Sequence, residues 1–188
     1  MIAGLILAGG EGRRMKGTSK PEVRLGHLSL IEHVVARLAL QTDRIFISGR
    51  QKYGTSLTNI PDLTADYKGP VGGLHASFQW LTRSQPEIEG VLLAPCDAPF
   101  LPATLLKYLK GESISAAHDG DRLHPTFSWW PRAGMEMALN KIEGSDVRSL
   151  HGLLELCDAR IVSFKSQNAF FNINTPEDIA TAERIISA

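Results

Sequence analysis

The sequence is poor in cysteine, has no net charge and contains no long apolar run. Cys96 and Cys157 are its only cysteines, too few for a disulfide-stapled secreted scaffold and without the close pairing of a redox or zinc motif. Its 20 basic and 20 acidic residues cancel, so no global field would hold the chain on nucleic acid or an anionic membrane. The apolar run at residues 2–8 is too short to cross a bilayer and lacks the basic leader of a secretory signal. We therefore expect a cytoplasmic protein with no nucleic-acid or membrane partner, in which any phosphate binding is local.

The length and apolar content predict one α/β domain over residues 1–188. With 188 residues and 43% hydrophobic content, the chain can build one substantial core but hardly a second large domain. Short apolar runs predict strands at residues 2–8, 44–48, 91–94, 114–118, 123–130 and 160–164. Helical apolar spacing predicts helices from residue 30 onward and at residues 74–81, 102–109, 131–139, 150–157 and 176–188. This alternation indicates βαβ units with right-handed crossovers and a mostly parallel sheet.

Local signals at the ends of these elements sharpen the prediction. Ser29, followed three positions later by Glu32, predicts a capping box at the start of the first helix. Thr175 before Pro176 predicts an N-cap and a proline at the first position of the last helix. Residues 69–73, Gly-Pro-Val-Gly-Gly, predict a loop that opens onto helix 74–81. Residues 119–121, Asp-Gly-Asp, predict a turn between two antiparallel strands.

A glycine-rich, basic segment follows directly on the first strand, where open α/β sheets bind ligands. Glycine lets backbone N–H groups approach an anion closely, because no Cβ stands in the way. Four basic side chains of this segment could neutralise a triphosphate: Arg13, Arg14, Lys16 and Lys20. We interpret the segment as a phosphate cradle, against the alternative of a solvated flexible loop.

Two familiar phosphate-binding motifs fail in this segment. A P-loop that began at Gly12 and Gly17 would need lysine where the chain has Thr18. A dinucleotide fingerprint that began at Gly10 and Gly12 would need a third glycine where the chain has Met15. Neither a P-loop ATPase nor a dehydrogenase is therefore favoured.

A second candidate lies at another strand end. Asp97 follows the strand at residues 91–94, at the tip where a carboxylate could hold Mg²⁺ together with substrate phosphates and water. Its position alone is equally typical of an ordinary aspartate that precedes a helix.

These motifs resemble the signature of nucleotidyltransferases with a Rossmann-like, nucleotide-diphospho-sugar transferase fold: Leu7-Ala8-Gly9-Gly10-x-Gly12-x-Arg14-Met15, followed by Lys20. Within that superfamily the chain resembles the molybdenum cofactor guanylyltransferase family. Four further blocks carry this narrower resemblance, in the family's order and over nearly the whole chain: Asp62 with Ala65-Asp66-Tyr67-x-Gly69-Pro70-x-x-Gly73, Pro95-Cys96-Asp97-x-Pro99, His118-Asp119-Gly120 with His124-Pro125-Thr126, and Asn172-x-Asn174-Thr175-Pro176-Glu177.

The resemblance implies a three-layer α/β/α fold and Mg²⁺-dependent transfer of GMP from GTP to the terminal phosphate of molybdopterin. It implies that the nucleotide is contacted by Leu7, Ala8, Gly9, Gly10, Lys20, Ser48, Asp62 and Asp97. Lys20, Arg14 and Asp97 would be catalytic, with Asp97 as the metal ligand. The pterin side would be formed by Asn172, Asn174, His118, Asp119 and His124. Proteins that deliver the pterin or accept the product are expected as transient partners.

Two alternatives remain open from the sequence. Ser19-Lys20-Pro21 is closer to sugar nucleotidyltransferases than to the guanylyltransferases, so a related cytidylyl or sugar-phosphate nucleotidyltransferase is the second hypothesis. A nucleotide-binding regulator without turnover is the third.

Overall fold

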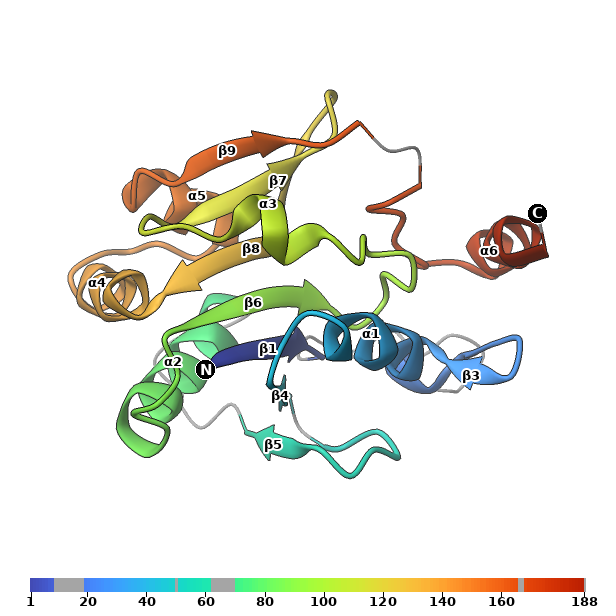
Figure 1. Cartoon of the computed structure of the whole chain (residues 1–188), viewed down its shortest axis with the longest axis horizontal. Coiled ribbons are helices and arrows are strands. Elements are labelled where there is room, and N and C mark those ends of the chain that lie inside the picture. The colour runs from blue at the N-terminus through green and yellow to red at the C-terminus, as the bar shows by residue number, and fades with distance from the viewer. Residues whose placement is uncertain (9–18, 50, 62–69, 166–167, 188) are drawn as a thin grey trace.

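A mostly parallel sheet forms the centre of the protein. The structure is a computed structural model that describes residues 1–8, 19–49, 51–61, 70–165 and 168–187. Within these residues seven strands form one sheet in the order β5-β4-β1-β6-β8-β7-β9 (Figure 1). Their bounds are β1 Ile2–Leu7, β4 Arg44–Ser48, β5 Thr58–Ile60, β6 Gly90–Pro95, β7 Ser115–His118, β8 Leu123–Pro131 and β9 Arg160–Ser163. Only β8 runs against its neighbours in this sheet, which confirms the predicted antiparallel pair and the mostly parallel sheet.

The inner strands are apolar because both of their faces are covered. All six residues of β6 are buried, as expected for a strand between two helical layers. In the sheet register Leu7 at the end of β1 lies beside Ser48 of β4 and Pro95 of β6. The three strands therefore end together, at what we name the carboxyl edge of the sheet. The βα connections of such sheets meet at this edge, which makes it the place to look for a ligand site.

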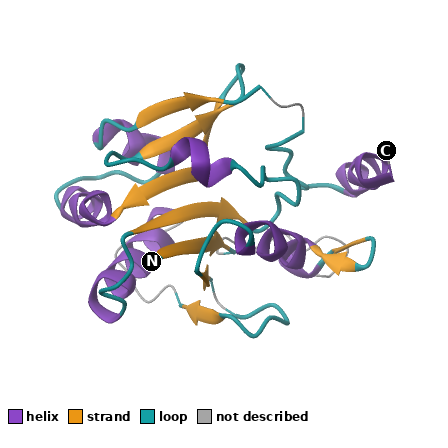
Figure 2. Cartoon of the chain, in the orientation of Figure 1, coloured by secondary structure: helices purple, strands orange, loops and turns teal. Residues whose placement is uncertain are grey.

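Helices cover both faces of the sheet, so the predicted three-layer arrangement is confirmed (Figure 2). Alternate side chains of β1 point to opposite faces: Leu5 joins the apolar cluster beneath α2, α4 and α5, whereas Ile6 joins the cluster beneath α1 and α3. The helices are α1 Leu30–Ala39, α2 Pro70–Ser84, α3 Leu105–Leu109, α4 Arg132–Glu143, α5 Leu150–Leu156 and α6 Pro176–Ser187. Because one sheet serves both layers, we keep the prediction of a single domain.

Both helix caps follow the predicted pattern. The Ser29 side chain accepts from the N–H of Glu32, and the Glu32 side chain accepts from the N–H of Ser29 at 2.6 Å, which closes the capping box of α1. The Thr175 hydroxyl accepts from the N–H of Asp178 at 3.2 Å and caps α6. Asp178 in turn accepts from the N–H of Thr175 at 2.8 Å.

Two predicted helix starts need correction. α2 begins at Pro70, so the predicted loop glycines 72 and 73 lie inside the helix; proline suits a first turn, and both glycines are buried there. α3 begins at Leu105 rather than at residue 102, because a turn bonds the N–H of Leu105 to the carbonyl of Pro102. The sequence analysis also missed β5 and the small hairpin of β2 Arg24–Leu25 and β3 Leu28–Ser29.

α6 does not belong to either helical layer on the sheet. It lies beyond the carboxyl ends of β1 and β6 (Figure 1) and packs on a small apolar cluster near the β2–β3 hairpin. This cluster consists of Val23, Leu25, Leu30, Ile173 and Ala182. The hairpin follows the one-turn helix η1 Lys20–Glu22. Through this cluster, α6 therefore packs against the segment that carries Lys20.

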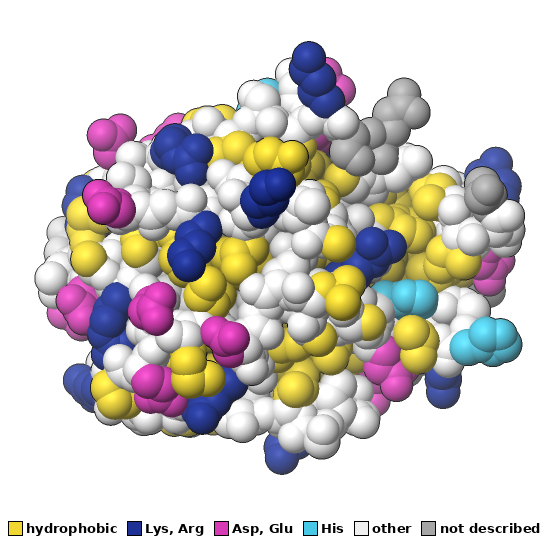
Figure 3. Space-filling view, in the orientation of Figure 1, with side chains coloured by type: hydrophobic (Ala, Val, Ile, Leu, Met, Phe, Trp, Pro, Cys, Tyr) yellow, Lys and Arg dark blue, Asp and Glu magenta, His cyan; other side chains and the backbone are white. Residues whose placement is uncertain are grey.

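Two observations concern the prediction that the protein has no nucleic-acid or membrane partner: the distribution of surface charge and the character of the helices. On the face seen in Figure 3, basic and acidic side chains are interspersed. Among the described residues, no helix combines the length and apolar character needed to cross a membrane.

Candidate functional site

The first strand delivers the chain to the carboxyl edge in a fixed direction. The N–H of Ala8 donates to the carbonyl of Ser48 at 2.8 Å, and the carbonyl of Leu7 accepts from the N–H of Cys96 at 3.1 Å. The Tyr53 hydroxyl donates to the carbonyl of Ala8 at 2.8 Å. Leu7 and Ala8 are thus held on both sides at the point where the glycine segment starts. Tyr53 was missed by the sequence analysis, and no local motif marks it.

Ser48 is the last residue of β4, and its side chain makes a hydrogen bond to another part of the protein. The hydroxyl is buried and donates to the carbonyl of Gly73 at 3.1 Å, which ties β4 to the first turn of α2. Gly49 follows, and a Cβ there would lie 3.2 Å from the carbonyl carbon of Ala8, so the two chains approach closely. Contact of Ser48 with a nucleotide stays a prediction.

Lys20 joins three distant segments at the carboxyl edge. Its ammonium group donates to Oδ2 of Asp97, which follows β6, and to Oδ1 of Asn174 at 2.7 Å. Lys20 stands in η1 after the glycine segment, and Asn174 precedes α6. The side chains of Lys20 and Asp97 are only 20% and 13% exposed. Three residues that the sequence analysis singled out separately therefore meet in one partly buried cluster.

The carboxylate of Asp97 has one oxygen bound and one open. Among the described residues, its Oδ1 is buried and has no hydrogen-bond partner. A buried carboxylate oxygen without a partner is costly, and a hard divalent cation is the ligand that would satisfy it. Within the described part of the chain, no three His, Cys, Asp or Glu side chains form a cluster. The residues present therefore fit an ion such as Mg²⁺, which takes one or two carboxylates and completes its shell with phosphate oxygens and water.

Asn172 and Asn174 lie on the same short stretch beside Asp97. The N–H of Ile173, between them, donates to the Asp97 carbonyl at 2.9 Å. Oδ1 of Asn172 is buried and unpartnered among the described residues, while Oδ1 of Asn174 accepts from Lys20. The stretch thus presents a second open polar atom near the cluster.

His118, Asp119 and His124 lie at the β7–β8 turn, on the same edge of the sheet. Oδ1 of Asp119 accepts from the N–H groups of Asp121 and Arg122, both at 2.9 Å, and Oδ2 contacts Nε2 of His124 at 2.6 Å. Nδ1 of His118 accepts from the N–H of Gly120 at 3.0 Å. Hydrogen bonds from Arg122, His124 and Asp121 lower the pKa of Asp119. These polar groups are bound within the turn itself, so their predicted contact with the pterin stays a prediction.

Six residues that the sequence analysis predicted for the nucleotide site fall outside the described residues: Gly9, Gly10, Arg13, Arg14, Lys16 and Asp62. Their assignment to the nucleotide stays a prediction of the sequence.

Cys96 directly precedes Asp97 but is unsuited to chemistry at neutral pH. Its side chain lies in the apolar cluster beneath α1 and α3. Burial, together with the adjacent Asp97 carboxylate, raises the pKa of the Cys96 thiol to about 12. The thiol therefore stays protonated and does not act as a nucleophile.

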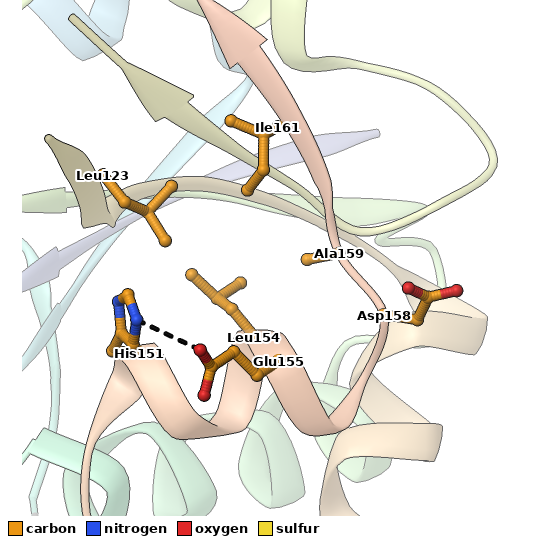
Figure 4. Close-up of a pocket in the computed structure, with 7 residues that line it drawn as sticks. All are labelled: Leu123, His151, Leu154, Glu155, Asp158, Ala159 and Ile161. Carbon is orange, nitrogen blue, oxygen red and sulfur yellow. Dashed lines mark ion pairs between the residues drawn. The ribbon is translucent and has the colours of Figure 1, made fainter. Parts of the chain in front are cut away.

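A pocket of about 420 Å³ opens elsewhere, between α5 and the strands β8 and β9 (Figure 4). An ion pair between His151 and Glu155 lies at its rim, with 3.3 Å between Nε2 and Oε1. None of the predicted site residues lines it; its lining is Leu123, His151, Leu154, Glu155, Asp158, Ala159 and Ile161. The candidate site is therefore defined by the chemistry at the carboxyl edge and not by this pocket.

Comparison with known proteins gives a consistent result over the full chain. Residues 4–160 match the MobA-like NTP transferase domain family. The molybdenum cofactor guanylyltransferase of Nitrobacter hamburgensis is 33% identical, over 97% of this chain and 93% of that protein. The enzyme of the same name from Serratia proteamaculans is 36% identical, over 94% of this chain and 91% of its own length. The crystal structure of molybdopterin-guanine dinucleotide biosynthesis protein A from Archaeoglobus fulgidus is 25% identical, with 98% of both chains covered and a TM-score of 0.74.

More distant structures share the fold alone. One is 4-diphosphocytidyl-2C-methyl-D-erythritolsynthase from Anaerococcus prevotii, which is 16% identical with a TM-score of 0.72 over 100% of this chain and 99% of that one. Another is a Mycobacterium tuberculosis protein in complex with manganese, which is 15% identical with a TM-score of 0.66 over 97% of this chain and 98% of that one.

Proposed function

Because this chain belongs to the MobA-like NTP transferase family and is a nucleotidyltransferase, we propose that it transfers GMP from GTP to the terminal phosphate of molybdopterin. The observation that carries this proposal is the identity of 33% and 36% to two molybdenum cofactor guanylyltransferases over nearly whole chains. The meeting of Lys20, Asp97 and Asn174 at the carboxyl edge supports it.

Catalysis of this reaction depends on charge neutralisation more than on acid–base chemistry. A terminal phosphate oxygen of the pterin attacks the α-phosphorus of GTP; a new P–O bond forms, the bond to the β-phosphate oxygen breaks, and pyrophosphate leaves with the electron pair. The attacking phosphate is already ionised near neutral pH, because the second pKa of such a group is about 6. No strong general base is therefore needed, and positioning with electrostatic stabilisation does the catalytic work.

We propose Lys20 as the cation that contacts the reacting phosphates. It lies in η1, directly after the glycine segment that would cradle the triphosphate, and its long side chain reaches Asp97. We assign Lys20 to the phosphates together with Arg14, and we assign the nucleotide's other contacts to Leu7, Ala8, Gly9, Gly10, Ser48 and Asp62.

We assign the divalent ion to Asp97 and name Mg²⁺ as the physiological metal. When bound, the ion would polarise the phosphate oxygens and neutralise charge on the leaving pyrophosphate. The open Oδ1 of Asp97 supports this assignment. A manganese complex of a protein with the same fold is consistent with use of a divalent cation.

The acceptor is assigned to the side of Asn172 and Asn174. Amide groups suit a polar pterin, because each offers both a donor and an acceptor. GTP is a cytoplasmic nucleotide, so we place the reaction in the cytoplasm, with transient contact to proteins that deliver the pterin or accept the dinucleotide.

Pyrophosphate release from each of the four nucleoside triphosphates tests the proposal. With Mg²⁺ and a molybdopterin source, we expect release from GTP alone, and mass spectrometry should find the guanine dinucleotide. His151→Gln, which changes the rim of the remote pocket, should behave as the wild-type protein does.

Two other results would reject the proposal. Faster release from CTP or UTP would instead favour a cytidylyl or sugar-phosphate nucleotidyltransferase. Binding of GTP without release under any acceptor condition would favour a regulator.

A further inference from the structure

The β7–β8 turn holds a buried histidine in a fixed orientation. His124 is 6% exposed, and its Nε2 donates to Oδ2 of Asp119 at 2.6 Å. Asp119 is itself anchored, because its Oδ1 accepts two backbone N–H groups of the turn. A carboxylate held in this way fixes both the position and the plane of the imidazole ring that donates to it.

The ring of His124 forms one wall around Phe170. The two rings stack at 4.6 Å between centroids with 27° between their planes. Phe127 and Phe164 contact Phe170 edge-on at 4.8 and 5.4 Å. Phe170 is 3% exposed, so its position is determined by this aromatic pocket, in which His124 is the member with a polar anchor.

Phe170 begins the short stretch that reaches the candidate site, residues 170–174, which we name the crossing segment. Its Ile173 donates to the Asp97 carbonyl at 2.9 Å, and its Asn174 accepts from Lys20 at 2.7 Å. Two residues of chain span at most about 7 Å. A fixed Phe170 therefore limits where Asn172, two positions on, can place its amide.

An apolar residue at position 124 would pack on Phe170 about as well as histidine does. A buried polar pair carries a desolvation cost, and well-packed hydrophobic replacements of such pairs are often neutral or stabilising. Packing alone therefore does not account for the Asp119–His124 pair. The pair also fixes the orientation of the His124 ring, because the imidazole cannot rotate away from Phe170 without breaking its hydrogen bond to the anchored Asp119 carboxylate.

We propose that Asp119 and His124 are positioning residues for the acceptor side of the site, acting through Phe170 and the crossing segment. The acceptor part of this inference rests on the proposed function. The mechanical part, that the pair fixes the crossing segment against Asp97, rests on the geometry alone.

Hydrogen exchange in the ligand-free protein tests the mechanical part. His124→Phe keeps an aromatic ring beside Phe170 but removes the bond to Asp119. We expect the Ile173 amide, which bonds to the Asp97 carbonyl, to exchange faster on the order of tenfold, the size expected for the loss of one charge-assisted hydrogen bond. Unchanged exchange at Ile173 would overturn the proposal.

His75→Phe is the matched control for this experiment. His75 is also buried, at 4% exposure, and its Nε2 lies 3.6 Å from a carboxylate oxygen of Glu143, but it belongs to α2 on the opposite face of the sheet. We expect the exchange of Ile173 to be unaffected by this variant. If His124→Phe does not fold, Phe170→Leu removes the stacked ring from the other side and carries the same expectation.

A double-mutant cycle with Asn174→Ala tests the acceptor part. We expect His124→Phe to raise the KM for molybdopterin with a smaller effect on the KM for GTP, and we expect this increase to shrink in the Asn174→Ala background. If the role were merely structural, His124→Phe would impair the use of molybdopterin and of GTP by the same factor with Asn174 present or replaced. That result would overturn the acceptor part. If no nucleoside triphosphate is turned over, the proposed function fails, while the exchange experiment still decides the mechanical part.

Discussion

Two aspartates follow parallel strands that end at the same edge of this sheet, with β8 between them, and the two have opposite surroundings. Asp119, after β7, has both carboxylate oxygens bound by its own turn and by His124. Asp97, after β6, has one oxygen bound by Lys20 and the other buried without a partner among the described residues. Both residues are aspartates that follow the carboxyl end of a strand. The difference teaches that the partners of a carboxylate decide whether it builds the protein or is left open for a ligand.

The largest expected effect is that of Asp97→Asn, which removes the open carboxylate but keeps its shape. Loss of the proposed metal ligand, with several kcal/mol of charge stabilisation, should lower turnover on the order of 10³-fold. Pyrophosphate release measures turnover, and thermal unfolding by circular dichroism should show a retained fold. If the variant kept wild-type turnover, the contrast between the two aspartates would be wrong.

Lys20→Met should have the next largest effect: it should lower turnover but strengthen the binding of Mn²⁺. Turnover should fall on the order of 10²-fold because a cation at the reacting phosphates is lost. Binding of Mn²⁺ without nucleotide should tighten about fivefold, since a competing ion pair worth about 1 kcal/mol is removed from Asp97. Electron paramagnetic resonance of free Mn²⁺ measures this affinity. Weaker Mn²⁺ binding would mean that Lys20 and the ion do not share Asp97.

Asp119→Asn should change stability with a defined dependence on pH. The pKa of Asp119 is lowered in the folded state, first by the Arg122 N–H and then by His124 and the Asp121 N–H. Its stabilisation is therefore complete above the unfolded value of about 4 and is lost as the pH falls toward the lowered folded value. Urea unfolding at pH 7 should show the variant to be less stable than wild type, and the gap should narrow progressively as the pH falls below about 4. A gap independent of pH would contradict this account.

Ser29→Ala should give the smallest effect, because it affects a carboxylate that is bound within its own turn and lies outside the candidate site. Glu32, like Asp119, is bound within its own turn, by the N–H and hydroxyl of Ser29. Loss of the cap should cost about 1 kcal/mol of unfolding free energy and leave pyrophosphate release unchanged. Thermal unfolding and the release assay together check both statements, and lost activity at an unchanged melting temperature would contradict them.

Much of the fold could be predicted because its signals are local. The strand at residues 44–48 has the predicted bounds, since an apolar run between polar residues is readable within five positions. The capping box of Ser29 and Glu32 is equally local. The start of α2 was missed because Gly72 and Gly73 suggest a loop, whereas burial against the end of β4 stabilises them in a helix.

The site was predictable as a set of residues but not as an arrangement. The glycine-rich segment indicated Lys20, a strand end indicated Asp97 and the family resemblance indicated Asn174, and only the folded chain brings the three together. No sequence pattern tells that one oxygen of Asp97 is open while Asp119 is fully bound, because these bonds come from backbone geometry and distant side chains. The stacking of His124 on Phe170 is hidden for the same reason.

The attachment of α6 has a consequence for how the protein is made. Lys20 and Asn174 are 154 positions apart, and Val23 and Leu25 are buried in the cluster that contains Ile173 and Ala182. The ribosome produces the hairpin after Lys20 well before the apolar surface of α6 that covers it. A domain generally folds as a unit, so Lys20 can reach its described position only after α6 has been translated. The nascent chain should therefore remain unable to act on nucleotide until α6 has been translated.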